Sequence, residues 1–84
     1  MKRYLVLVMR KPKFDIAPAP AHNVFLDGLR AEQRLELSGP FSDKSGGAYL
    51  LRADSLEEAQ AIAHRDPLHT HRVSTITIHE WNAI

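Results

Sequence analysis

The sequence predicts an α+β domain in which two amphipathic helices lie on one face of a four-stranded antiparallel sheet. Three observations carry this prediction. Short segments rich in Val, Leu and Ile have the continuous or alternating apolar pattern of strands, and two longer segments carry apolar residues at helical spacing. These segments follow one another as strand, helix, strand, strand, helix, strand. The chain has 84 residues, and we therefore expect a single domain over residues 1–84.

The first strand and the first helix are expected over residues 3–9 and roughly 18–33. The strand is a continuous apolar run bounded by charge, which is typical of burial on both faces. The helix follows a proline-rich segment, and proline is tolerated in a first helical turn. Its apolar stripe consists of His22, Phe25, Leu26 and Leu29. His22 is the unusual member, because a histidine aimed into a small core generally has a hydrogen-bonding partner.

A β-hairpin is expected in the middle of the chain. Its first strand is predicted by the alternation of Leu35, Leu37 and Phe41. Gly39-Pro40 closes this strand, and the polar, glycine-rich segment 43–47 forms the turn. The partner strand then covers residues 48–52.

The second helix begins with a capping box. The hydroxyl of Ser55 can accept a hydrogen bond from the amide of Glu58, and the Glu58 side chain reaches back toward the helix start. Pro67 cannot continue the helix, so we expect it to end near Arg65. Its inner stripe consists of Leu56, Ala59, Ile62 and Ala63. A last strand is expected over roughly 72–80, with Ile76 and Ile78 on one side.

This order of elements predicts a ferredoxin-like βαββαβ fold. Two helices cover only one face of such a sheet, yet the first strand offers apolar side chains to both faces. Leu5, Leu7 and Met9 lie on one side of it, and Tyr4, Val6 and Val8 lie on the other. We therefore expect a homodimer in which the open sheet faces of two copies pack together.

Composition excludes several classes of protein and site. Cysteine is absent, so there are no disulfides and no thiolate metal sites, and a reducing cytoplasmic location is expected. The net charge of +1 is spread over both signs, so no nucleic-acid partner is expected. No run approaches the roughly 18 apolar residues that span a bilayer, so no membrane partner is expected either.

Several short motifs follow one another along nearly the whole chain. They are Pro20-Ala21-His22 with Phe25-Leu26, Leu37-Ser38-Gly39-Pro40, Ser55-Leu56-Glu57-Glu58-Ala59, Asp66-Pro67 and Glu80-Trp81. In their order and spacing the chain resembles the YCII-related (YciI-like) family of small dimeric α+β-barrel proteins. The resemblance implies a cavity in each subunit that contains a histidine and an aspartate, here His22 and Asp66. One related branch is implicated in dechlorinating a hydroxylated aromatic, and similar barrels isomerise lactones or oxidise polyketides without a metal.

Three positions depart from the family pattern. Many members carry an arginine three residues before the histidine, where this chain has Ala19, and an aromatic residue after Asp-Pro, where it has Leu68. These two departures concern the family's contacts with substrate. Gln33 stands where a glycine commonly ends the first helix, and a non-glycine residue in a left-handed cap costs about 1 kcal/mol.

His22 and Asp66 are the candidate catalytic residues. Asp66 would accept a hydrogen bond from one ring nitrogen of His22, which fixes the tautomer and makes the other nitrogen a better base. Asp66 is also suited to capping its own turn, as aspartate before proline often does. On that second interpretation the pair is a satisfied contact of the core.

The candidate substrate-binding residues are Ser38, Gly39, Arg10 and His69. Ser38 can add a hydrogen bond inside the cavity, and Gly39 lets a ligand approach the backbone. Arg10 can hold a carboxylate at the mouth, although a charge at a strand end is also what water favours. His69 follows Asp66 closely, and with His64 and His71 it could collect a metal. No zinc signature has this spacing, so we expect no metal site.

The main hypothesis is a small cofactor-free enzyme that uses His22 and Asp66 for acid–base chemistry. The reaction would be elimination, dehalogenation or isomerisation of a small organic acid or phenol-like metabolite. A non-catalytic module that binds a small molecule or supports another protein is the alternative, and a purely structural dimer is a third. An enzyme requires a reachable cavity with the imidazole exposed to it, whereas a structural pair requires a closed, dry contact.

Overall fold

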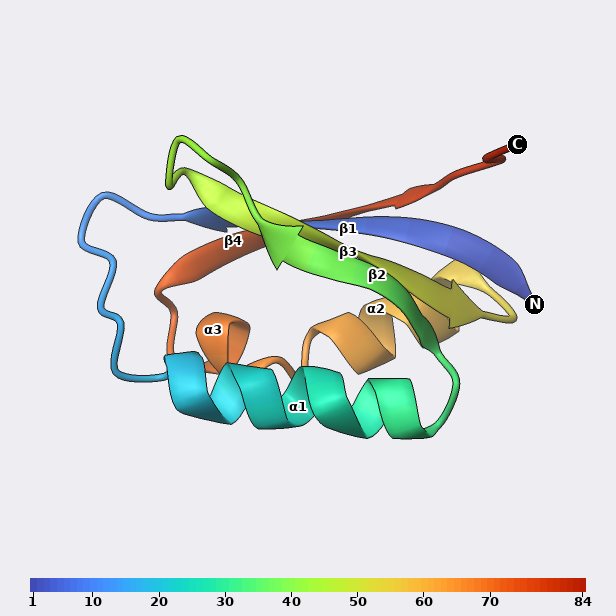
Figure 1. The fold of residues 1–84 in the computed structure, drawn as a ribbon, viewed down its shortest axis with the longest axis horizontal. Coiled ribbons are helices and arrows are strands. Elements are labelled where there is room, and N and C mark those ends of the chain that lie inside the picture. Colours follow the sequence, from blue (N-terminus) through green and yellow to red (C-terminus); the bar gives the residue numbers. More distant parts are fainter.

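The computed structural model describes residues 1–84 and has the predicted α+β architecture. Helices lie on one face of the sheet (Figure 1), and the strand order is β2-β3-β1-β4 with neighbouring strands antiparallel. This is the ferredoxin-like arrangement. The elements are β1 (Lys2–Arg10), α1 (Ala19–Ala31), β2 (Leu35–Pro40), β3 (Gly46–Ala53), α2 (Leu56–Ala63), α3 (Pro67–Thr70) and β4 (Ser74–Glu80). No helix has the length and apolar character needed to cross a membrane.

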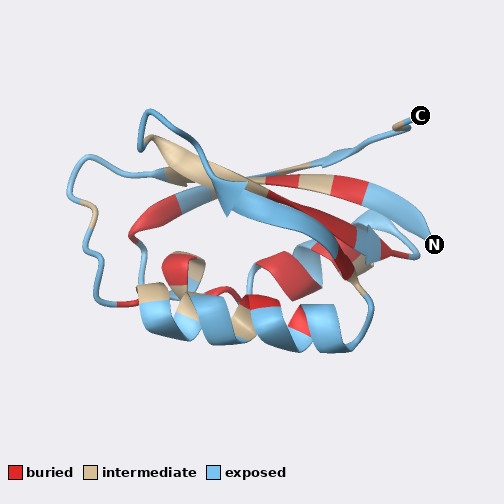
Figure 2. Cartoon of the chain, viewed as in Figure 1, coloured by how far each residue is buried: buried red, intermediate tan, exposed pale blue.

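The core lies between the helices and one face of the sheet. Burial alternates along β1, which Figure 2 shows as alternating red and tan segments. Tyr4, Val6 and Val8 are buried on the helix side. Leu5, Leu7 and Met9 point to the opposite, open face and are only half-buried. The sequence pattern therefore assigned the two sides of this strand correctly.

Helix α1 begins and ends with the residue types that the sequence indicated. Pro18 is its N-cap, and a proline follows within the first turn. The helix ends at Ala31, and Gln33 has a left-handed backbone with φ of 60°. This conformation lets the amide of Arg34 donate to the Leu29 carbonyl oxygen at 2.9 Å. The bond satisfies one of the carbonyl groups that a helix end leaves free.

Strand β2 does not follow the simple alternation expected of it. Leu35 pairs with Leu51 and Leu37 pairs with Leu50, so one extra residue forms a β-bulge between them. Leu35 is consequently 8% exposed on the helix side, whereas Leu37 is 70% exposed on the open face. The prediction that the two leucines share a face was wrong. A bulge leaves no mark in the apolar pattern of so short a strand.

The bulge also positions the residues that follow it. Ser38 pairs with Tyr49, which faces the helices, so Ser38 faces them too. If Glu36 were paired in regular register instead of bulging, Ser38 would point to the open face. The bulge therefore places Ser38, a candidate binding residue, on the helix side of the sheet.

The hairpin brings glycine-rich backbone close to both neighbouring strands. Gly46 has φ of 153°, and a Cβ atom at this position would lie 2.2 Å from the Val8 carbonyl oxygen. A Cβ atom on Gly47 would lie 2.6 Å from the Gly39 carbonyl oxygen. Any larger residue would push β3 away from β1 or β2. These two glycines therefore allow β3 to approach β1 and β2 closely at this end of the sheet.

Helix α2 has the predicted N-terminal cap, but the burial of its first residue and the position of its last residue differ from the prediction. The Ser55 hydroxyl accepts from the Glu58 amide at 3.1 Å, while the Glu58 carboxylate accepts from the Asp54 amide at 3.2 Å. Arg34 also donates to Glu58 and holds the pKa of that carboxyl below its usual range. Leu56, expected in the buried stripe, is exposed because it occupies the first helical position. The helix ends at Ala63, before the predicted end near Arg65.

Candidate active site

His22 and Asp66 meet at the end of the molecule where α1 begins. The two residues are 44 positions apart in the chain, and Nδ1 of His22 lies 2.8 and 2.9 Å from the two carboxylate oxygens of Asp66. Asp66 is fully buried at 0% exposure, whereas the His22 side chain is 16% exposed. A buried carboxylate without a partner would be costly. The His22 ring supplies the partner while one edge of the ring remains open.

Asp66 also caps a short helix that the sequence did not predict. Its Oδ1 accepts from the Leu68 amide at 2.9 Å, and Asp66 is the N-cap of α3. Proline at the first position of this four-residue helix suits its fixed φ and lacks the N–H that would otherwise go unpaired. Both interpretations of Asp66, as histidine partner and as turn cap, therefore describe the same carboxylate. The cap fixes the carboxylate that in turn fixes the ring.

The contact with Asp66 determines which ring nitrogen of His22 is available. A carboxylate only accepts hydrogen bonds, so Nδ1 carries the proton and donates. Nε2 then holds the lone pair of the neutral ring, and no protein group makes a hydrogen bond to it. An imidazole held in this way can accept a proton at Nε2 from another molecule.

A pocket of about 410 Å³ adjoins His22 on the helix side of the sheet. Its volume lies within the range of about 300–1,000 Å³ that is usual for small-molecule sites. Segments from β1, α1, β2, β3, α3 and β4 contribute to it, together with the loop before α1. The apolar wall consists mainly of Val8, Phe14, Ile16, Leu26 and Leu68. Ser38 and Ile16 are exposed, so the pocket opens to the surface beside them.

Three of the four predicted substrate-binding residues line this pocket. Ser38 accepts a hydrogen bond from Arg30 Nη2 at 3.2 Å, which leaves its own O–H free to donate. Gly39 lines the pocket with its backbone, and a side chain at this position would point to the open face, because Gly39 pairs with Ala48 and Ala48 pairs with Leu7. The Arg10 guanidinium lies 4.3 Å above the centre of the Phe14 ring, at the end of β1. A cation–π contact of this kind orients the guanidinium at the rim.

His69, the fourth predicted residue, lies outside the pocket, and that prediction was wrong. It belongs to α3 and stacks on His64, with 4.6 Å between the ring centres. The helical turn after Asp66 carries the ring away from the pocket and into a separate shallow depression beside Lys11 and Arg72. The structure contains no group of three or more histidine, aspartate or glutamate side chains placed to hold a metal ion.

Three further polar residues, Asn23, Tyr49 and Ser74, line the pocket, and none of them was among the predicted binding residues. The hydroxyls of Tyr49 and Ser74 are buried and have no hydrogen-bond partner in the protein. Each unpaired buried hydroxyl costs on the order of 1–3 kcal/mol. Burial, together with the nearby Asp66 carboxylate, raises the pKa of Tyr49, so the phenol keeps its proton. Tyr49 lies two residues before Leu51 on the same strand, so strand alternation could have placed both on the helix side. Nothing in the sequence marks Ser74.

Comparison with known proteins bears on this geometry. A family model described as the YCII-related domain matches residues 2–82. The chain belongs to the YCII-related family. The resemblance that the sequence motifs suggested is thereby confirmed.

Two relatives of this YCII-related chain are informative. It is 53% identical over 81 residues to the uncharacterised protein YjpA of Bacillus subtilis strain 168, covering 96% of this chain and 95% of that protein. Its fold resembles that of 5-chloro-2-hydroxyhydroquinone dehydrochlorinase (TftG) from Burkholderia phenoliruptrix AC1100, solved in complex with 2,5-dihydroxybenzoquinone. The TM-score is 0.83 at 19% identity, over 98% of this chain and 95% of the other. This likeness establishes a shared fold.

The two departures from the YCII-related pattern that concern substrate contacts both lie in the pocket wall. Ala19 and Leu68 line the pocket, on α1 and α3 respectively. The resemblance implies a long cation at the first place and an aromatic ring at the second.

Proposed function

We propose that this protein is a cofactor-free enzyme that performs acid–base chemistry on a small organic acid or phenol-like metabolite. The observation that carries the proposal is the Nδ1 contact of His22 with both oxygens of buried Asp66, at the wall of a pocket open to the surface. A purely structural pair would not need a reachable cavity beside the ring. His22 is the proposed base and acid, and Asp66 orients it.

The proposed mechanism is a proton transfer through Nε2 of His22. Nε2 takes a proton from a hydroxyl or an activated carbon of the substrate, and Asp66 stabilises the imidazolium that forms. In an elimination or dehalogenation, the electron pair of the broken O–H or C–H bond forms a new π bond in the substrate. The leaving group departs with the electrons of its own bond. In an isomerisation, His22 returns the proton to a different carbon. Positioned proton transfer accelerates a reaction by about 10²–10⁴-fold, which suits an activated substrate.

The remaining predicted residues have binding roles in this proposal. Arg10 at the rim attracts a carboxylate or phenolate, Ser38 donates a hydrogen bond, and the backbone of Gly39 contacts the ligand. TftG is a dehydrochlorinase that acts on a chlorinated, hydroxylated ring, which is the same class of chemistry. It supplies the first probes for this chain.

The test is turnover by the purified wild-type protein. Chlorinated hydroxyhydroquinones and activated organic acids are incubated with the protein, and chloride release and ultraviolet absorbance are followed. We expect at least one compound to react about 10²-fold or more above the rate in buffer. If the protein binds these compounds and accelerates none of them, the enzymatic proposal fails in favour of the non-catalytic binding module.

We further propose that two copies associate through the open sheet face. Leu5, Leu7 and Met9 are half-buried there, and Leu37 is largely exposed beside them. Apolar side chains clustered on a sheet face favour burial against another surface. A second copy is the simplest partner, because the same face then covers itself.

We expect Leu7→Lys to convert a dimer into a monomer, because a lysine at the centre of the open face would be desolvated in the interface. Sedimentation velocity at several concentrations measures the dissociation constant, which should rise at least about tenfold. Val24→Lys is the matched control, since Val24 is exposed on α1, away from this face. A wild-type protein that sediments as a monomer throughout would contradict the proposal.

A further inference from the structure

Two buried hydroxyl groups beside the pocket have no use in the chemistry proposed for His22. Tyr49 and Ser74 are each 2% exposed, and their oxygens have no hydrogen-bond partner in the protein. They come from different strands, β3 and β4, yet both residues line the pocket that adjoins His22. Buried hydroxyls are normally paired, so two unpaired ones in one pocket require an explanation.

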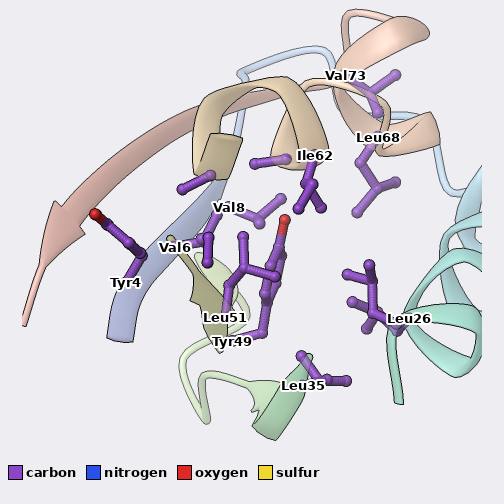
Figure 3. Packing of buried hydrophobic residues seen from close by; sticks show 14 residues of the cluster. Tyr4, Val6, Val8, Leu26, Leu35, Tyr49, Leu51, Ile62, Leu68 and Val73 are labelled. Carbon is purple, nitrogen blue, oxygen red and sulfur yellow. The ribbon is translucent and has the colours of Figure 1, made fainter. Parts of the chain in front are cut away.

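The surroundings of Tyr49 indicate that its hydroxyl has a role other than packing. Its ring stands within the apolar cluster, and Figure 3 shows the oxygen at the end of the ring that points away from Leu35. A phenylalanine would fill the same apolar space without an unpaired hydroxyl. Burial and the Asp66 carboxylate raise the pKa of Tyr49, so its hydroxyl remains a hydrogen-bond donor. An acceptor on a ligand would therefore satisfy its free O–H.

We propose that Tyr49 and Ser74 bind an acceptor oxygen of the ligand, and that the ligand is a compact ring carrying a carbonyl or ionised hydroxyl group. The apolar wall formed by Val8, Leu26 and Leu68 suits the faces of a ring. The oxygen substituents at the edge of such a ring accept hydrogen bonds from Tyr49 and Ser74 in this proposal. The proposal rests on the proposed function, for which it names the substrate class.

Binding requires side-chain adjustments, because both oxygens are covered in the ligand-free protein. Ser74 can turn its hydroxyl toward the pocket by changing its χ1 rotamer, and side-chain changes of this kind commonly accompany ligand binding. The ligand oxygen then replaces the missing partner of each hydroxyl. If His22 removes a proton from the ligand, the same donors can stabilise the negative oxygen that results.

The experiment measures binding and stability in the same set of variants. The probe is 2,5-dihydroxybenzoquinone, followed by calorimetric titration into the wild type, Tyr49→Phe and Ser74→Ala. We expect about tenfold weaker binding for each variant, which corresponds to the loss of one buried hydrogen bond. The melting temperature of the ligand-free variants should stay equal or rise, because the substitution removes an unpaired buried hydroxyl.

Tyr4→Phe is the matched control. Tyr4 is a second buried tyrosine on the helix side, its hydroxyl contacts Glu80 at 3.5 Å, and it does not line the pocket. This variant should bind the probe as the wild type does. The proposal is overturned if the wild type does not bind the probe or if Tyr49→Phe binds it equally well. It is also overturned if Tyr49→Phe lowers the melting temperature by several degrees, since its hydroxyl would then have a structural partner.

Failure of this proposal is distinguishable from failure of the proposed function. Weaker binding by Tyr49→Phe without turnover by the wild type would sink the acid–base function and leave the ligand site standing. Turnover that depends on His22 but not on Tyr49 or Ser74 would do the reverse.

Discussion

Replacing His22 by glutamine is expected to lower the turnover number by about 10²–10⁴-fold, the usual contribution of a positioned acid–base group. Glutamine approaches histidine in size, and its amide can still donate a hydrogen bond to the Asp66 carboxylate. The fold and the pocket should therefore survive. What is lost is Nε2, the only atom of the pair that can take up and release a proton at neutral pH.

The measurement compares kcat for whichever compound the wild type turns over, with circular dichroism as the check on folding. His71→Gln is the control, because His71 is an exposed histidine that does not line the pocket. It should retain wild-type turnover. Turnover by His22→Gln within about threefold of the wild type would assign the chemistry to another group.

Replacing Asp66 by alanine is expected to lower the free energy of unfolding by about 3–5 kcal/mol. The substitution leaves two donors without an acceptor, Nδ1 of His22 and the amide of Leu68. It also removes the cap of α3. Domains of this size are stable by roughly 5–15 kcal/mol, so such a loss is large enough to unfold part of the population.

Urea denaturation measures this loss as a shift of the midpoint by about 2 M. Asp66→Asn should fall between alanine and the wild type, because asparagine keeps an oxygen that can cap α3. Asp27→Ala is the control: Asp27 pairs with Arg30 on the surface, and its loss should change stability by at most about 0.5 kcal/mol. A cost below about 1 kcal/mol for Asp66→Ala would mean that the contact with His22 contributes little.

The sequence predicted the elements well where apolar periodicity is long and continuous. Strand β1 and helix α1 lie within two residues of their expected bounds, because each buries a sustained stripe. Errors arose where one residue changes the geometry. The bulge between Leu35 and Leu37 and the four-residue helix after Asp66 are both decided by hydrogen bonds rather than by apolar pattern.

The candidate site was predictable in its ionisable pair and less so in its walls. His22 stood out because it interrupts an apolar stripe, and Asp66 because it precedes a proline. Tyr49 looks like any aromatic residue of a buried strand, and only the structure shows that its hydroxyl has no partner. The prediction for His69 failed because a helical turn points its ring away from the pocket, although it is close to Asp66 in sequence. Unpaired hydroxyls are a property of three-dimensional packing.

The bulge in β2 gives the length of one short segment an importance that its composition does not have. Deleting Glu36 would restore regular pairing and leave Leu37 opposite Leu50 and Ser38 opposite Tyr49, on the faces that they already occupy. If Glu36 stayed and paired in regular register, Leu37 would turn to the helix side and Ser38 to the open face. A leucine would then project into the pocket, and the serine would leave it. Relatives of this chain are best compared by counting residues between Leu35 and Gly39 before their identities are weighed.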